Sequence, residues 1–206
     1  MNTVLVFDLD NTLYPYRSGL FTYINQRMNA FIQKRFDLSY EEVDQIRTNY
    51  IQRYGTTQQG LAEEHGISPE EFLCYAHDIE IEKYLQRSFL FRETLRTIPY
   101  PKYLFTNSPL HYARRILRHL QIEDLFVSLT TIEKLHYIGK PNRSAYEVLI
   151  QQLPDELQEV KLIDDEPKNI EMGKQFGMIG ILVNGREIPP SEYYDHFLTP
   201  LLKEKL

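Results

Sequence analysis

The stretch Thr3-Val4-Leu5-Val6-Phe7-Asp8-Leu9-Asp10 joins five mostly apolar residues to a pair of carboxylates. A short run of β-branched and aromatic residues is typical of a strand that is buried on both faces. The two acids follow its carboxyl end, and open parallel sheets bind their ligands outside that edge. The stretch therefore predicts a first, buried parallel strand and a polar loop that carries chemistry.

Four further apolar runs are predicted as strands: residues 102–105, 125–129, 160–163 and 179–183. Amphipathic helices are predicted between them, over residues 109–120, 144–152 and 168–176. The first of these helices is expected to begin with Ser108 as its N-cap and Pro109 in its first turn. Alternating strands and helices indicate βαβ crossovers. We therefore predict an α/β fold with a Rossmann-like, doubly wound parallel sheet.

Residues 17–89 interrupt this alternation, because they show helical periodicity and no convincing strand. Ser39-x-x-Glu42 and Ser68-x-x-Glu71 each have the pattern of a capping box at a helix N-terminus. We predict an inserted all-α domain of about four helices at residues 17–89. The α/β core domain then comprises residues 1–16 and 90–206, with residues 189–206 open between a short helix and irregular chain.

Composition limits the possible partners. The 206 residues carry 29 acidic and 23 basic side chains, a net charge of −6, which argues against nucleic-acid polymers and anionic membranes as partners. The single cysteine, Cys74, allows no intramolecular disulfide, and we expect it to be a small buried apolar residue. No signal peptide or membrane-spanning segment is predicted, so the expected location is the cytoplasm.

Polar side chains gather at the predicted carboxyl ends of the strands. They are Asp8, Asp10, Thr106, Asn107, Lys140, Asp164 and Asp165. Four carboxylates at one edge would raise one another's pKa, and a divalent cation removes that conflict. Oxygen ligands without histidine or cysteine point to Mg²⁺, which commonly shares its ligands with a phosphate.

These side chains suggest phosphate chemistry. Asp8 and Asp10 are two residues apart, so one can attack phosphorus as a carboxylate, forming an aspartyl-phosphate, while the other transfers protons. The Lys140 ammonium, the Thr106 hydroxyl and the amides around Asn107 would hold the phosphate oxygens. Lys134 competes with Lys140 for the ammonium role, but it lacks the Gly-Lys-Pro context.

Four ordered segments resemble the motifs of the haloacid dehalogenase superfamily. They are Asp8-Leu9-Asp10-Asn11-Thr12-Leu13-Tyr14-Pro15, Phe105-Thr106-Asn107, Gly139-Lys140-Pro141 and Ile163-Asp164-Asp165-Glu166-x-x-Asn169. The insertion resembles the helical cap of that superfamily. The Leu-Tyr-Pro continuation and Phe-Thr-Asn look most like the pyrimidine 5′-nucleotidase branch.

The resemblance implies a role for each matching residue. Asp8 would be the nucleophile and a metal ligand, and Asp10 the general acid and base, with its backbone carbonyl on the metal. Lys140 would stabilise the nucleophile and the transferring phosphoryl group. Phosphate binding would fall to Thr106, Asn107 and Asn11, and metal binding to Asp165 and, directly or through water, Asp164. Asn169 would not bind the metal itself but would contact the residues that do.

The resemblance also implies the reaction. Dehalogenases of the superfamily work without metal and lack the acid at the position of Asp10, so its presence favours phosphate-ester hydrolysis. A nucleoside 5′-monophosphate is the first substrate expected. A sugar phosphate, or a phosphomutase reaction, is the alternative, and Tyr14, Tyr16, Tyr23 or Tyr54 could stack a base.

A phospho-accepting signalling module is the alternative from another class. Receiver domains also combine acids, a hydroxyl residue and a lysine on a parallel sheet. They have no helical insertion after the first strand, however, and they place the acid pair before the phosphorylated aspartate. In this chain Asp164-Asp165 comes last.

Overall fold

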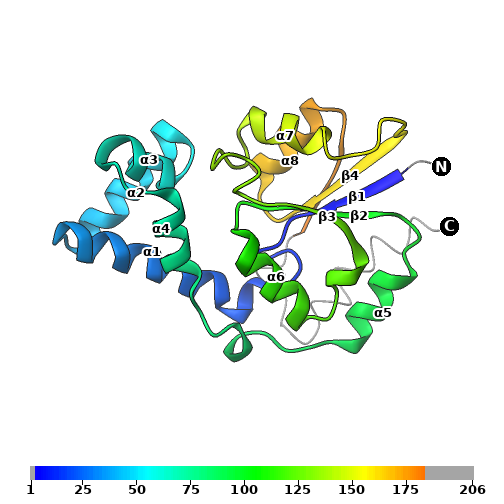
Figure 1. Cartoon of the computed structure of the whole chain (residues 1–206), viewed down its shortest axis with the longest axis horizontal. Helices are drawn as coiled ribbons and strands as arrows, with labels where there is room; N and C mark the ends of the chain where they lie inside the picture. Colours follow the sequence, from blue (N-terminus) through cyan, green and yellow to red (C-terminus); the bar gives the residue numbers. More distant parts are fainter. Residues whose placement is uncertain (1–2, 184–206) are drawn as a thin grey trace.

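The computed structural model describes residues 3–183, and the segment predicted ambiguously at 189–206 lies outside that range. A parallel sheet has the strand order β3-β2-β1-β4-β5 (Figure 1). Its strands are β1 (Thr3–Phe7), β2 (Lys102–Phe105), β3 (Phe126–Thr130), β4 (Glu159–Asp164) and β5 (Ile179–Leu182). The predicted doubly wound α/β fold is confirmed, with β1 at the centre of the sheet.

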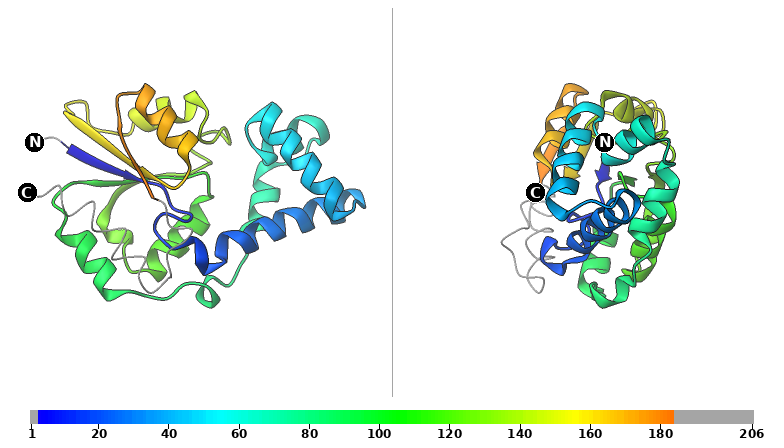
Figure 2. Two further views of the ribbon diagram at one scale, coloured as in Figure 1. Left: turned by 180° about the vertical axis from the view of Figure 1, so that it is seen from behind. Right: turned by 90° about the vertical axis from the view of Figure 1, so that its left-hand side faces the viewer.

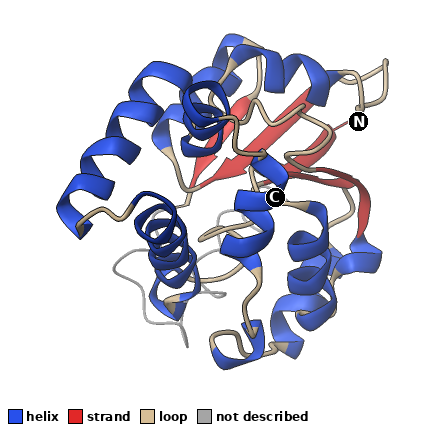
Figure 3. Cartoon of the chain, turned by 60° about the vertical axis from the view of Figure 1, so that its left-hand side comes forward, coloured by secondary structure: helices blue, strands red, loops and turns tan. Residues whose placement is uncertain are grey.

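Helices cover both faces of the sheet, as Figures 1 and 3 show. One face carries α5 (Phe89–Thr97) and α6 (Leu110–His119), and the other carries α7 (Arg143–Ile150) and α8 (Pro167–Gln175). The side chains of β1 alternate between the two layers. Leu5 and Phe7 pack with the α5 and α6 side, whereas Val4 and Val6 pack with the α7 and α8 side. All five β1 residues are buried, which explains its unbroken apolar sequence.

The long elements of the insertion between β1 and β2 are all α-helices. It contains α1 (Leu20–Phe36), α2 (Tyr40–Tyr54), α3 (Thr57–His65) and α4 (Pro69–His77). Short 3₁₀ turns occur at η1 (Tyr16–Ser18), η2 (Ile81–Lys83) and, later in the chain, η3 (Glu123–Leu125). The four helices form a separate group beyond the carboxyl ends of the strands (Figure 2).

Local signals explain where these helices begin. The Ser39–Glu42 capping box is present in both directions, as predicted. At the second predicted box, the Ser68 hydroxyl accepts a hydrogen bond from the Glu71 backbone N–H. Each cap satisfies a backbone donor that the first helical turn leaves without an intrahelical partner.

Two sequence expectations are wrong. The N-cap of α6 is Pro109 rather than Ser108, whose hydroxyl instead donates to the Asp10 carboxylate. Cys74 is exposed rather than buried, because it lies on a solvent-facing side of α4. An amphipathic period fixes which residues share a helix face, but it places a small residue near the boundary of that face poorly.

The insertion contacts the core through α4 and the segment after it. The His77 ring of α4 packs edge-on against the Tyr112 ring of α6, with 4.7 Å between centroids. The Arg115 guanidinium of α6 donates to the Ile79 carbonyl at 2.7 Å. Among residues 3–183, none of the helices combines the length and apolarity that crossing a bilayer requires.

Candidate active site

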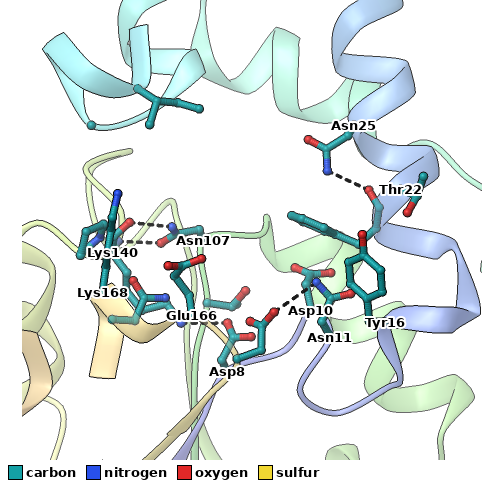
Figure 4. Close-up of a pocket in the computed structure, with 17 residues that line it drawn as sticks. Asp8, Asp10, Asn11, Tyr16, Thr22, Asn25, Asn107, Lys140, Glu166 and Lys168 are labelled. Carbon is teal, nitrogen blue, oxygen red and sulfur yellow. Dashed lines mark hydrogen bonds and ion pairs between the residues drawn. The ribbon is translucent and has the colours of Figure 1, made fainter. Parts of the chain in front are cut away.

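The carboxyl ends of three strands bring the predicted site residues together. The Asp8 backbone N–H donates to the Ile163 carbonyl at 2.9 Å, which extends the pairing of β1 with β4 by one residue. The Thr106 N–H donates to the Thr130 carbonyl at 3.0 Å and extends β2 beside β3 in the same way. Asp164 is the last residue of β4. Side chains far apart in sequence therefore face one cavity (Figure 4).

Lys140 lies at the centre of the site. Its ammonium donates to Asp8 Oδ1 at 2.8 Å, to Asp164 Oδ2 at 2.7 Å and to the Phe105 carbonyl at 2.8 Å. An ammonium has three N–H donors, so these contacts use all of them. Burial alone would lower the pKa of Lys140, but Asp164 and Asp8 together raise it above its ordinary value. Lys140 is therefore a permanent cation.

Reciprocal contacts fix the loop that carries Lys140. The Asn107 side-chain amide donates to the Lys140 carbonyl at 2.9 Å and accepts from the Lys140 N–H at 2.7 Å. Gly139 allows this approach, because a Cβ there would lie 2.4 Å from Asn107 Oδ1. Asn107, predicted as a phosphate-binding residue, thus also positions the lysine.

The two acids at the end of β4 have different surroundings. Asp164 is fully buried, and both of its oxygens accept hydrogen bonds from protein groups. Lys140 and the Asn169 amide donate to Oδ2, and the Asn169 amide and the Glu166 N–H donate to Oδ1. Asp165 lines the cavity and accepts from the Asn11 amide at 3.3 Å. Asp165 is thus the acid presented to a ligand, and Asp164 the one that holds Lys140.

The donor set fits a cation. One oxygen from each of Asp8, Asp164 and Asp165 lies within 4.8 Å of the others. Burial, together with Asp164, raises the pKa of Asp165 to about 6. Burial also raises the pKa of Asp8 well above its usual range, with Lys140 opposing the shift. A divalent cation beside these carboxylates would relieve the repulsion and favour their charged forms.

Asp10 is held by three hydroxyl groups that sequence reasoning did not connect with it. Ser108 Oγ donates to Asp10 Oδ2 at 2.5 Å, and Tyr112 donates to Oδ1 at 3.0 Å. Tyr14 also donates to Oδ1. Burial raises the pKa of Tyr14 and of Tyr112 well above the usual value, so both hydroxyls remain protonated donors.

The cavity has a volume of about 680 Å³ and separates the sheet edge from the insertion. Its sheet side includes seven of the eight predicted site residues: Asp8, Asp10, Asn11, Thr106, Asn107, Lys140 and Asp165. Asp164 lies behind Lys140. The opposite side comes from η1, α1 and α2, with Tyr16, Phe21, Thr22, Asn25, Ile51 and Gly55.

Of the four tyrosines considered for base stacking, Tyr16 alone lines this cavity. Tyr14 is buried against Asp10 and Tyr112. Tyr23 stacks on Tyr84, and the Tyr54 hydroxyl donates to Glu64. No pattern in the sequence distinguishes these four rings, because each lies in or beside a helix with aromatic neighbours.

A Rossmann-like core with a helical insertion after β1, and acids at the ends of β1 and β4 around a buried lysine, defines a hydrolase of the haloacid dehalogenase type. The family model for haloacid dehalogenase-like hydrolases matches residues 3–177. The chain belongs to this family.

One curated relative is "Phosphate metabolism protein 8" from Saccharomyces cerevisiae (strain ATCC 204508 / S288c). It is 28% identical over 193 residues, covering 85% of this chain and 59% of the yeast protein. The chain thus spans less than two thirds of that relative's length.

Solved structures share the fold over nearly the whole chain. A HAD phosphatase from Thermococcus onnurineus has a TM-score of 0.63 and 18% identity, covering 98% of this chain and 97% of its own. The putative HAD-hydrolase YfnB from Bacillus subtilis, bound to magnesium, has a TM-score of 0.62 and 16% identity, covering 97% and 98%. A 2-haloacid dehalogenase from Pseudomonas syringae has a TM-score of 0.55 and 19% identity, covering 100% of both chains.

Proposed function

We propose that this protein is a Mg²⁺-dependent phosphomonoesterase that acts through an aspartyl-phosphate on Asp8. The observation that carries the proposal is the position of the Lys140 ammonium, 2.8 Å from Asp8 Oδ1 and at the wall of a cavity that Asp10 and Thr106 also line. A fixed cation beside a carboxylate both orients the nucleophile and stabilises the negative charge of a transferring phosphoryl group.

The residues divide the reaction into two steps. An Asp8 oxygen attacks phosphorus, the bond to the ester oxygen breaks, and Asp10 supplies the proton that the departing alkoxide needs. In the second step Asp10 takes a proton from water, which attacks the phosphorus and restores the Asp8 carboxylate. Thr106 and Asn107 would hold the remaining phosphate oxygens, with Asn11 nearby.

Asp8 and Asp165 are the carboxylates that would hold Mg²⁺, together with the Asp10 backbone carbonyl. Asp164 would contribute through water, because its own oxygens already accept from protein donors. When bound, the ion neutralises charge on the phosphate and so lowers the repulsion that an anionic nucleophile meets.

We propose residues 17–89 as a cap domain over this site and residues 1–16 with 90–206 as the core domain. The cavity supports this division, because one wall comes from α1 and α2 and the other from the sheet edge. A cap of this kind excludes bulk water and selects the leaving group. The first substrate that we propose is a nucleoside 5′-monophosphate, as for pyrimidine 5′-nucleotidases. The alternatives are hydrolysis of a sugar phosphate and a phosphomutase reaction.

The test is phosphate release from p-nitrophenyl phosphate and from a panel of phosphorylated metabolites, nucleotides first. Asp8→Asn should abolish turnover while circular dichroism shows a folded protein. Retained activity in that variant would remove Asp8 as the nucleophile. A single persistent phosphorylation without turnover would instead indicate a signalling module, and chloride release from a 2-chloro acid would indicate a dehalogenase.

A further inference from the structure

The Asn25 side chain of α1 lines the cavity on the side opposite Lys140 and Asn107 (Figure 4). Its Oδ1 accepts from an Arg47 guanidinium nitrogen at 2.9 Å, and its Nδ2 donates to the Phe21 carbonyl at 3.0 Å. A guanidinium can only donate and a carbonyl can only accept. The two contacts independently fix which end of the amide is oxygen and which is nitrogen.

Arg47 makes this orientation permanent. It reaches from α2 to α1 and donates to the Asn25 backbone carbonyl at 3.3 Å and to Asn29 Oδ1 at 2.5 Å, in addition to Asn25 Oδ1. Asn29 is itself buried. Rotating the Asn25 amide would place its NH₂ group against the guanidinium. This is unfavourable, because two donors would then face each other without an acceptor in a half-buried site.

The locked amide turns its oxygen toward Arg47 and keeps one N–H for a ligand. An Asn Nδ2 carries two N–H bonds, and the Phe21 carbonyl takes one of them. The second N–H takes no part in these contacts, and because Asn25 lines the cavity we assign this N–H to a ligand there. The cavity thus presents a hydrogen-bond donor at a fixed place on the wall that meets the leaving group.

Most of the side chains that line the cavity beside Asn25 are apolar or aromatic, and Thr22 adds a hydroxyl. Tyr16 is 36% exposed and Ile51 is 49% exposed, and both line the cavity with Phe21. A flat ring buries its faces against such side chains. Sugar hydroxyls both donate and accept, so a single fixed donor distinguishes them poorly, whereas a ring carbonyl only accepts.

We infer that Asn25, locked by Arg47, is a specificity-determining residue that donates a hydrogen bond to a carbonyl on a planar ring of the leaving group. The uracil base of a departing uridine is such a ring. The inference rests on the proposed phosphomonoesterase function and narrows its substrate class toward nucleotides with a base carbonyl. Asn25 takes no part in the chemical step, so it alters selection between leaving groups and leaves phosphoryl transfer itself intact.

The experiment compares uridine 5′-monophosphate with ribose 5-phosphate, which has a similar ester and no base. Asn25→Asp keeps an acceptor for Arg47, so the protein should fold, but it replaces the donor by a second acceptor. We expect kcat/KM for uridine 5′-monophosphate to fall about 10- to 100-fold, with ribose 5-phosphate changed less than about twofold. Asn49→Asp, the same change at an exposed position on α2, should alter neither substrate.

Asn25→Ala provides a second variant, which removes the donor without adding charge and should reduce the preference in the same direction. Thermal melting of each variant establishes that it is folded. An equal effect on both substrates, no effect on either, or a wild type without preference for the nucleotide would overturn the inference. If the wild type still hydrolyses p-nitrophenyl phosphate in those cases, the proposed phosphomonoesterase function stands without the inference on Asn25. If the wild type hydrolyses none of the phosphate esters, both the function and the inference fail.

Discussion

The Lys140 ammonium lies 2.7 Å from Asp164 Oδ2, and both side chains are buried. Asp164 is held in turn by the Asn169 amide and the Glu166 N–H, so the ion pair has a fixed geometry. A cation held in this way needs no reorganisation when negative charge develops at the phosphoryl group. Asp164 thus sets the direction in which Lys140 presents its charge to Asp8.

Lys140→Ala should therefore lower kcat by about 10²- to 10³-fold, or about 3–4 kcal/mol of transition-state stabilisation. Steady-state phosphate release measures the loss, and circular dichroism monitors the fold. Lys134→Ala is the matched control, because Lys134 is exposed and its ammonium donates to Gln152 at 3.5 Å. A loss below ~1 kcal/mol for Lys140→Ala would show that the Lys140 ammonium does not stabilise the transferring phosphoryl group.

Tyr14→Phe should impair Asp10 without touching the phosphate site. The variant removes one hydroxyl that donates to Asp10 Oδ1 and leaves Tyr112 and Ser108 in place. Proton donation matters for a poor leaving group and little for p-nitrophenolate, which departs as a stable anion. We expect kcat to fall roughly tenfold or more for an alkyl phosphate, with a much smaller loss for p-nitrophenyl phosphate.

Tyr75→Phe is the control for this variant, since Tyr75 lies on the exposed side of α4. Equal losses of kcat on the alkyl and the p-nitrophenyl ester in Tyr14→Phe would show that Tyr14 supports the fold and has no role in orienting Asp10.

Removing the metal should stop turnover, and Mg²⁺ should restore it. Chelation with EDTA tests this on the wild type, and indifference to EDTA would contradict the metal assignment. Asp165→Asn removes a cavity-lining carboxylate and should weaken the Mg²⁺-induced rise in melting temperature, which is measured without substrate. Asp155→Asn, at an exposed position, should leave that rise unchanged.

Much of the sheet was predictable because its strands are short and mostly apolar, and because β1 and β2 are followed directly by polar residues. The run Thr3–Phe7 is buried on both faces, so its composition alone identified it, and Asp8 then had to lie at the sheet edge. The ligand-facing residues followed from the same rule. The local sequence pattern was sufficient to predict an element wherever burial alone determined its composition.

The surroundings of Asp10 could not be predicted in this way. Tyr112 lies 102 positions beyond Asp10 on the buried face of α6, where any aromatic residue would satisfy the helical period. Ser108 had a sufficient local explanation as an N-cap, and the tertiary contact with Asp10 replaced it. Such contacts depend on how α6 is placed against β1, which no single segment specifies.

We expect His77 to make the stability of the protein depend on pH. Its ring is buried, its Nδ1 lies 2.8 Å from the Leu73 carbonyl, and it packs on Tyr112. Burial lowers the pKa of His77 below its ordinary 6.5, and the charge of Asp10 opposes part of that shift. Below pH 6.5 the unfolded chain therefore binds a proton that the folded chain resists.

The sign follows directly from that difference. Above the pKa of the unfolded chain, His77 is neutral in both states and costs no stability. As the pH falls below that pKa, the unfolded chain gains a proton and the folded protein becomes less stable relative to it. The free energy of unfolding should fall as the pH is lowered from about 7.5 to about 5.5. We expect this fall to be up to about 1 kcal/mol smaller in His77→Phe than in the wild type. Urea unfolding at both pH values measures this difference, with His136→Asn, at an exposed position, as control. The same pH dependence in His77→Phe and the wild type would mean that His77 binds its proton equally in the folded and unfolded states, and that packing between α4 and α6 does not lower the pKa of its ring.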